Sequence, residues 1–110
     1  MKLYIDSTNN LATKIKIDDQ EYIKEVDSPR KQNVFGFLTQ CLQEKGVKIT
    51  DITEIEVNPG PGSFTGSRVG VAIANALSFG LKVKLNGKNT PIDPIYSSPP
   101  SITLPKAKLS

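Results

Sequence analysis

Residues 58–80 read NPGPGSFTGSRVGVAIANALSFG and place a loop of glycine and proline directly before an apolar segment. Within that segment Val69, Ile73 and Leu77 recur at helical spacing, which predicts a helix over residues 66–80 that ends near Gly80. Before the loop, the alternating EIEV of residues 54–57 predicts a strand. A strand, a tight loop and a helix in this order indicate an α/β fold.

The flanking segments complete this pattern. Three short β-rich segments separated by turn residues predict an antiparallel meander over residues 2–6, 11–17 and 21–26. Residues 28–46 predict a first helix, with Ser28 as N-cap and Gly46 at its end. Residues 81–85 alternate again and predict a fifth strand. The order β-β-β-α-β-α-β predicts a mixed sheet carrying helices, an α/β fold of the ribonuclease-H kind.

Composition excludes several kinds of site. The 110 residues contain one cysteine and no histidine, so there is no internal disulfide, no Cys/His metal cluster and no histidine general base. Cys41 falls on the apolar stripe of the first predicted helix, so we expect a buried structural thiol. The first residues lack an apolar run, which predicts no membrane span and a cytoplasmic protein.

The net charge of +3 comes from the last quarter of the chain, because residues 82–110 hold five lysines and one aspartate. Residues 86–110 are also rich in proline, and we expect them to form an extended basic tail. Such a tail suits a solubilising role or contact with an acidic partner such as tRNA.

The loop of residues 60–66 lies where backbone N–H groups and a helix dipole attract anions. Its spacing nevertheless matches neither the Walker nor the Rossmann phosphate loop. Ser63 and Thr65 have no histidine to activate them as nucleophiles. An anion-binding loop and a purely structural turn therefore both stay open on the residues alone.

The stretch NPGPGSFTGSRVGVAIANALSFGL (residues 58–81) closely resembles the hallmark segment of the TsaB (YeaZ) family, Gly-Pro-Gly-Ser-Phe-Thr-Gly-x-Arg followed by a helix of small residues. YIDST (residues 4–8) is similar to the first strand of the family, and residues 27–57 stand in place of its first helix and next strand. The resemblance covers roughly residues 2–85.

The resemblance implies an actin/Hsp70-like fold of two ribonuclease-H-like lobes. We expect residues 1–85 to form the first lobe and residues 86–110 to stand in place of the second. It also implies a non-catalytic accessory subunit of the machinery that makes threonylcarbamoyladenosine in tRNA. Expected partners are a TsaD-like catalytic subunit and a TsaE-like ATPase, with tRNA contacted indirectly and no membrane. A single lobe exposes apolar surface, so we expect a dimer or a hetero-complex.

The expected site residues fall into three groups, and none is catalytic or a metal ligand. The signature loop, expected to contact a partner or a nucleotide, comprises Pro59, Gly60, Pro61, Gly62, Ser63, Phe64, Thr65, Gly66 and Arg68. A candidate phosphate loop comprises Asp6, Ser7 and Thr8. A helix interface is expected on the row Gly66, Gly70, Ala74 and Ser78, with a second small-residue row at Ala72, Ala76 and Gly80.

No cofactor is expected to be bound by this chain alone, and ATP or ADP would be held at a partner interface. The alternative hypothesis is a nucleotide-binding module or weak phosphohydrolase that uses the loop of residues 60–66. A metalloprotease is excluded because the sequence lacks histidine and a metal-ligand set.

Overall fold

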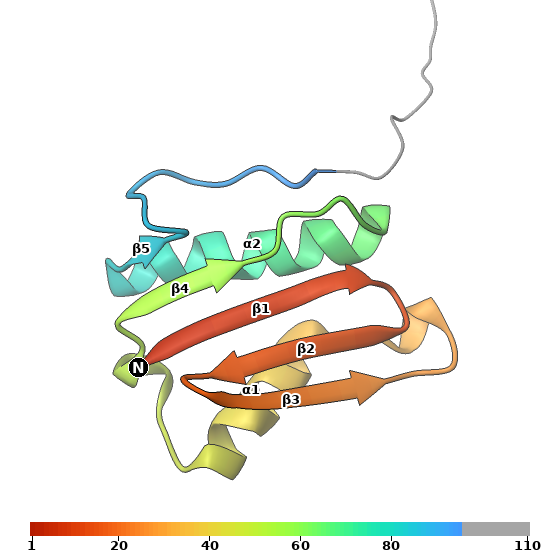
Figure 1. Ribbon diagram of the computed structural model, residues 1–110, viewed down its shortest axis with the longest axis horizontal. Coiled ribbons are helices and arrows are strands. Elements are labelled where there is room, and N and C mark those ends of the chain that lie inside the picture. Colours follow the sequence, from red (N-terminus) through yellow and green to blue (C-terminus); the bar gives the residue numbers. More distant parts are fainter. Residues whose placement is uncertain (96–110) are drawn as a thin grey trace, which may run out of the picture.

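The computed structural model describes residues 1–95 and forms one five-stranded mixed sheet. The strand order across the sheet is β3-β2-β1-β4-β5 (Figure 1). The first three strands are antiparallel neighbours, whereas β4 and β5 run parallel to β1. The strands are β1 (Lys2–Asn9), β2 (Ala12–Ile17), β3 (Gln20–Glu25), β4 (Glu54–Val57) and β5 (Lys84–Leu85). This topology confirms the predicted mixed sheet with its N-terminal meander.

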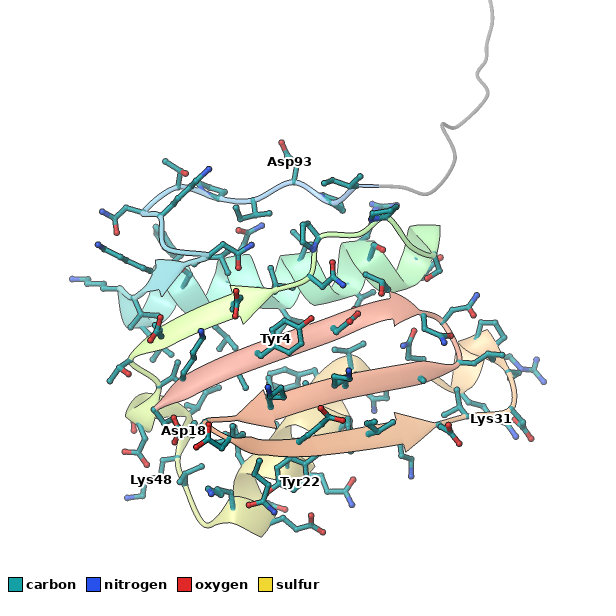
Figure 2. All side chains as sticks on the ribbon, viewed as in Figure 1. Tyr4, Asp18, Tyr22, Lys31, Lys48 and Asp93 are labelled. Carbon is teal, nitrogen blue, oxygen red and sulfur yellow. The ribbon has the colours of Figure 1, made fainter. Side chains whose placement is uncertain are left out.

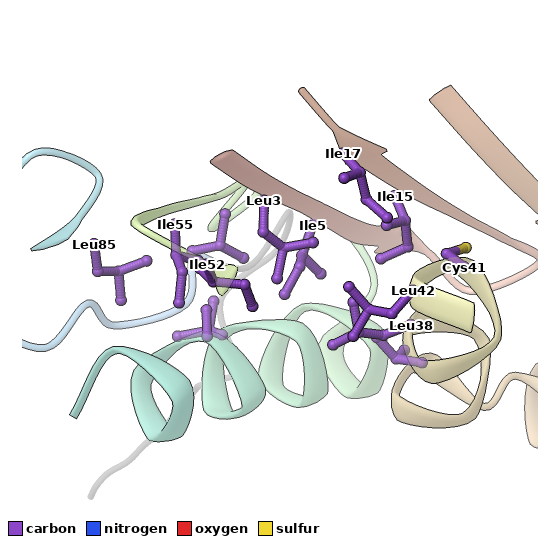
Figure 3. Close-up of a cluster of buried hydrophobic side chains, with 14 residues drawn as sticks. Leu3, Ile5, Ile15, Ile17, Leu38, Cys41, Leu42, Ile52, Ile55 and Leu85 are labelled. Atoms are coloured by element: carbon purple, nitrogen blue, oxygen red, sulfur yellow. The ribbon is translucent and has the colours of Figure 1, made fainter. Parts of the chain in front are cut away.

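Two helices, α1 (Val34–Lys45) and α2 (Phe64–Leu81), cover one face of this sheet (Figure 1). The alternating buried residues of the strands, such as Ile5 and Ile15, meet the helices in one aliphatic core (Figure 3). Leu38 and Cys41 enter the core from α1, and Ala74 enters it from α2. The predicted burial of Cys41 is confirmed by its exposed fraction of 1%.

The other face of the sheet carries polar side chains. Strand register places Asp6 opposite Lys14 and Tyr4 opposite Lys16, and Lys2 forms an ion pair with Glu56 at 3.3 Å. Tyr4 lies on this face near the middle of the sheet (Figure 2). Alternation of polar and apolar residues along β1, β2 and β4 therefore decides which face the helices cover.

The start of α1 differs from the prediction. Residues Pro29–Lys31 form a separate 3-10 turn, and Ser28 makes no side-chain capping hydrogen bond. The cap is Asn33, whose side-chain oxygen accepts a hydrogen bond of 2.9 Å from the Gly36 N–H. Gly46 ends the helix in a left-handed conformation with φ of 76°, as the sequence predicts.

The second helix is longer than predicted, and the fifth strand is shorter. Ser63 caps α2 by accepting a hydrogen bond of 3.1 Å from the Gly66 N–H, so the helix includes the end of the signature loop. The helix continues to Leu81, and Lys82 ends it with φ of 58°. Only residues 84 and 85 of the predicted strand 81–85 therefore pair with β4. Residues 96–110 of the predicted tail lie outside the described residues.

Candidate functional site

The loop between β4 and α2, residues 58–63, lies beside the end of β1. Because β1 and β4 are parallel neighbours, their carboxyl ends reach the same edge of the sheet. The Asn58 N–H donates to the Ile5 carbonyl at 2.9 Å, and the Ser63 N–H donates to the Thr8 carbonyl at 2.7 Å. The structure thus brings together two of the predicted groups, the signature loop and residues 6–8.

Glycines of the signature loop allow this close approach. A Cβ atom at Gly62 would overlap Thr8, and one at Gly66 would overlap the Ser7 carbonyl. Gly60 has φ of 113°, a conformation that L-residues rarely adopt, and a Cβ there would overlap the Ile95 carbonyl. The pattern Gly-x-Gly-x-x-x-Gly therefore follows from packing the loop directly on neighbouring backbone.

Asp6 organises the end of β1 through four hydrogen bonds. Its Oδ1 accepts from the Thr8 hydroxyl at 2.7 Å and from the Thr8 N–H at 3.0 Å. Its Oδ2 accepts from the Asn58 amide at 3.2 Å and from the Tyr4 hydroxyl at 3.4 Å. Partial burial disfavours the charged carboxylate, but these donors outweigh it and lower the pKa of Asp6 below its ordinary value.

Ser7 fastens α2 to the sheet. Its side chain is 1% exposed, and its hydroxyl donates to the Gly66 carbonyl at 2.6 Å. The Ser7 hydroxyl and both Thr8 donors, which a phosphate would require, are therefore engaged within the chain. Residues 6–8 therefore form the irregular end of β1, where the pairing with β2 shifts register, and their engaged donors weigh against the nucleotide-binding alternative.

The remaining signature residues begin α2. Phe64, Thr65, Gly66 and Arg68 belong to the first two turns of the helix, while residues 59–63 form the loop before it. Thr65 and Arg68 are exposed and line a shallow hollow of about 230 Å³ together with Val69 and Ala72. The positive end of the helix dipole and Arg68 therefore lie next to an apolar surface.

The expected helix interface needs correction. A Cβ at Gly70 would overlap the Ser7 hydroxyl, Gly66 contacts the Ser7 carbonyl, and Ala74 is fully buried. The Ser78 hydroxyl donates to the Val83 carbonyl at 2.5 Å. Gly66, Gly70 and Ala74 thus pack against the chain's own sheet and are not available to a partner, while Ser78 is half-buried and bonded to the backbone that follows α2.

The exposed side of α2 is apolar instead. Val69, Ala72, Ala76 and Phe79 lie along it, and the exposed fraction of Phe79 is 88%. Phe35 of α1, 49% exposed, lies beside this side of the helix.

A hollow of about 390 Å³ lies between the two helices and is lined by Phe35, Ala72, Ile73, Ala76 and Leu77. We call Phe35, Val69, Ala72, Ala76 and Phe79 the helical face. Two residues of the helical face, Ala72 and Ala76, belong to the second small-residue row that the sequence shows, Ala72, Ala76 and Gly80.

Other kinds of site find no support in the described part of the chain. Within residues 1–95 no group of three His, Cys, Asp or Glu side chains could hold a metal ion. None of the helices formed by these residues is long and apolar enough to cross a membrane.

Residues 27–96, more than half of the chain, match the model of the family described as TsaD: tRNA N6-adenosine threonylcarbamoyltransferase. The chain belongs to this family. Within it the chain is a TsaB/YeaZ member, since several curated relatives carry the name TsaB. The resemblance drawn from the signature loop is thereby confirmed.

Two relatives illustrate the similarity. The tRNA threonylcarbamoyladenosine biosynthesis protein TsaB of Escherichia coli is 36% identical over 59 residues, which cover 54% of this chain and 26% of that protein. The tRNA N6-adenosine threonylcarbamoyltransferase of Chromobacterium violaceum is 39% identical over 56 residues, covering 51% of this chain and 14% of that enzyme. The match therefore spans about a quarter or less of these relatives.

The fold is also found in solved structures. YeaZ from Pseudomonas aeruginosa superposes with a TM-score of 0.63 at 22% identity, covering 76% of this chain and 42% of that one. This likeness establishes the fold and confirms the predicted ribonuclease-H-like, actin-type lobe. The chain spans less than half the length of the proteins it matches.

Proposed function

We propose that this TsaB/YeaZ member is an accessory subunit in the synthesis of threonylcarbamoyladenosine in tRNA and that it binds a TsaD-like catalytic subunit. The names of its relatives support the process, because TsaB and a threonylcarbamoyltransferase both match the chain. The match to the TsaD family itself supports a partner of similar fold.

The helical face is the observation that carries the proposal. Its residues come from two packed helices. Ala72 and Ala76 are too small to obstruct a partner, and the larger Phe35 and Val69 lie beside them. Small residues flanked by exposed aromatic and β-branched side chains allow another helix to approach closely. Over the exposed side of α2 only Arg68 is charged, so a partner helix would lose little hydration on docking.

The chemistry of the described residues supports a non-catalytic role. The Asp6 carboxylate is committed to Thr8, Asn58 and Tyr4. Burial, with a smaller contribution from the Glu44 charge, raises the pKa of the Cys41 thiol to about 11, which disfavours the nucleophilic thiolate. We therefore propose that the chain acts by binding its partner and not by a catalytic side chain of its own.

Co-purification of the full chain with a TsaD-like subunit tests this proposal. Ala72→Glu places a carboxylate in the centre of the helical face and should abolish recovery of the partner. The matched control is Thr50→Glu, which adds the same charge at an exposed turn between α1 and β4. Equal recovery of the TsaD-like subunit with both variants would show that the helical face is not the docking site.

The helical face is also a candidate contact surface in a homodimer, and a TsaE-like ATPase is a further expected partner. Two copies of the chain could pair through their helical faces, in which case the TsaD-like subunit would compete with self-association. Sedimentation of the chain alone, of its mixture with the TsaD-like subunit, and of the mixture with a TsaE-like ATPase separates these assemblies. We expect the hetero-complex to form and the ATPase to join it only when the TsaD-like subunit is present.

A further inference from the structure

Residues 86–95 form an extended segment that runs back along α2 from the end of β5 to the signature loop (Figure 1). We call it the strap. It begins with a tight reversal in which Asn86 and Gly87 have φ of 51° and 78°. The Leu85 and Lys88 backbones exchange two hydrogen bonds across this turn, at 2.9 and 3.0 Å. An Asn-Gly pair in this conformation is the preferred two-residue hairpin turn.

Asn86 anchors the start of the strap to β4. Its N–H donates to the Ile55 carbonyl at 2.9 Å. Its side-chain amide accepts from the Val57 N–H at 2.8 Å and donates to the Val57 carbonyl at 3.1 Å. The side chain thus continues the ladder of β4 two residues before the signature loop begins at Pro59.

Asn75 of α2 holds the middle of the strap. Its amide donates to the Ile92 carbonyl at 2.8 Å and accepts from the Ile92 N–H at 2.9 Å, so both backbone groups of Ile92 are satisfied by one side chain. Before this point the strap stands away from α2 and leaves a hollow of about 530 Å³, lined in part by Phe79, Lys82 and Pro91. Asp93 points away from the helix (Figure 2). Asn75 therefore joins strap and helix by two hydrogen bonds, beside the packing of the Ile92 side chain against the core.

The far end of the strap lies on the signature loop. The Ile95 N–H donates to the Pro59 carbonyl, and the Ile95 carbonyl occupies the space that a Cβ at Gly60 would need. Gly60 is thus glycine for a second reason besides its φ of 113°, because the strap crosses directly above it.

We propose that the strap is a positioning device that holds the signature loop in its observed conformation, with Asn75 as its latch. Three anchors on β4, α2 and the loop restrain a segment that has no regular secondary structure of its own. Loops restrained in this way open less often than free ones, and amide exchange reports the difference. The proposal concerns the loop itself and stands whether or not a TsaD-like subunit docks on α2.

Hydrogen exchange of the full chain tests the strap with the variant Asn75→Ala. We expect exchange at Ile92, at Ile95 and at the loop amides of Gly60 and Ser63 to become about tenfold faster, since two hydrogen bonds of the latch are lost. Amides of β1 should keep their protection, which shows that the fold is intact. The control is Asn89→Ala at an exposed position of the same strap, which should leave the loop unchanged.

A second variant covers the case in which Asn75→Ala disturbs the whole chain. Asn75→Asp keeps the size of the side chain and an acceptor for the Ile92 N–H, but it replaces the donor with an oxygen that repels the Ile92 carbonyl, so loop exchange should again become faster. Faster exchange confined to Ile92, with Gly60 and Ser63 as protected as before, would overturn the proposal and leave the strap a passive segment. Partner binding is not part of this readout, so a failed docking experiment does not affect it.

Discussion

The contact between Gly70 of α2 and Ser7 of β1 allows a sharp test of how the helix is seated. A Cβ at position 70 would overlap the Ser7 hydroxyl, while the next atoms, Ser7 Cβ and Ile5 Cγ2, would lie at 3.4 and 3.7 Å. The hydroxyl cannot turn away without losing its hydrogen bond to the Gly66 carbonyl. Gly70→Ala alone should therefore be destabilising, and Gly70→Ala combined with Ser7→Ala should not.

The magnitudes follow from three contributions. Overpacking a closed site costs about 1–3 kcal/mol. Alanine in place of glycine within a helix stabilises it by about 1 kcal/mol. Removing the Ser7 hydroxyl loses one hydrogen bond, worth about 1 kcal/mol. Gly70→Ala should thus lower the free energy of unfolding by about 1 kcal/mol, whereas the same change made in Ser7→Ala should raise it by about 1 kcal/mol.

Urea unfolding of the four proteins in this double-mutant cycle measures the coupling between the two positions. We expect a coupling free energy of about 2 kcal/mol that favours the double variant. Additive effects would refute the seating of Gly70 on Ser7. Such a result would also reopen the question of whether the row Gly66, Gly70, Ala74 faces outward to a partner.

Three further predictions concern single groups. Because burial raises the pKa of Cys41 from 9.0 to about 11, alkylation of the folded chain by iodoacetamide at pH 8 should be at least about a hundredfold slower than in urea, and equal rates would contradict the burial. Asp6 has a lowered pKa, so it stabilises the folded state above its unfolded pKa and this contribution is lost as the pH falls through its folded pKa. Between pH 7 and pH 3, urea unfolding should therefore show a larger loss of stability for the wild type than for Asp6→Asn. Asn33→Ala should lower the free energy of unfolding by about 1 kcal/mol, because it removes the cap of α1. Ser28→Ala should leave that free energy unchanged in the same assay. The reverse order would show that Ser28 is the cap, as the sequence predicts.

Periodicity was sufficient to predict the fold. Alternating residues located the strands, the 3.6-residue spacing located both helices, and the order of the elements predicted the mixed sheet. Helix ends were harder to predict, because Ser28-Pro29 and Asn33 both carry capping chemistry and local sequence does not decide between them. The predicted fifth strand was too long, because α2 continues to Leu81 and Lys82 then adopts a left-handed conformation that its residue type does not favour.

For the candidate site, the sequence marked the residues of the signature loop but not the contacts that they make. The glycines of the signature loop were recognised, but the reason for each is a tertiary contact with Thr8, Ser7 or Ile95 that the sequence does not contain. The same limit explains the misplaced helix interface. Two rows of small residues occur on α2, and only the position of the sheet shows that one row is covered and the other is exposed.

Site-specific photocrosslinking tests the central claim most directly. A photoreactive residue at position 72, in the middle of the helical face, should capture a TsaD-like subunit mixed with the full chain. The same residue at position 14, on the polar face of the sheet, should capture little. Capture from position 14 and none from position 72 would contradict the proposal that this TsaB/YeaZ member docks its partner through the exposed side of α2.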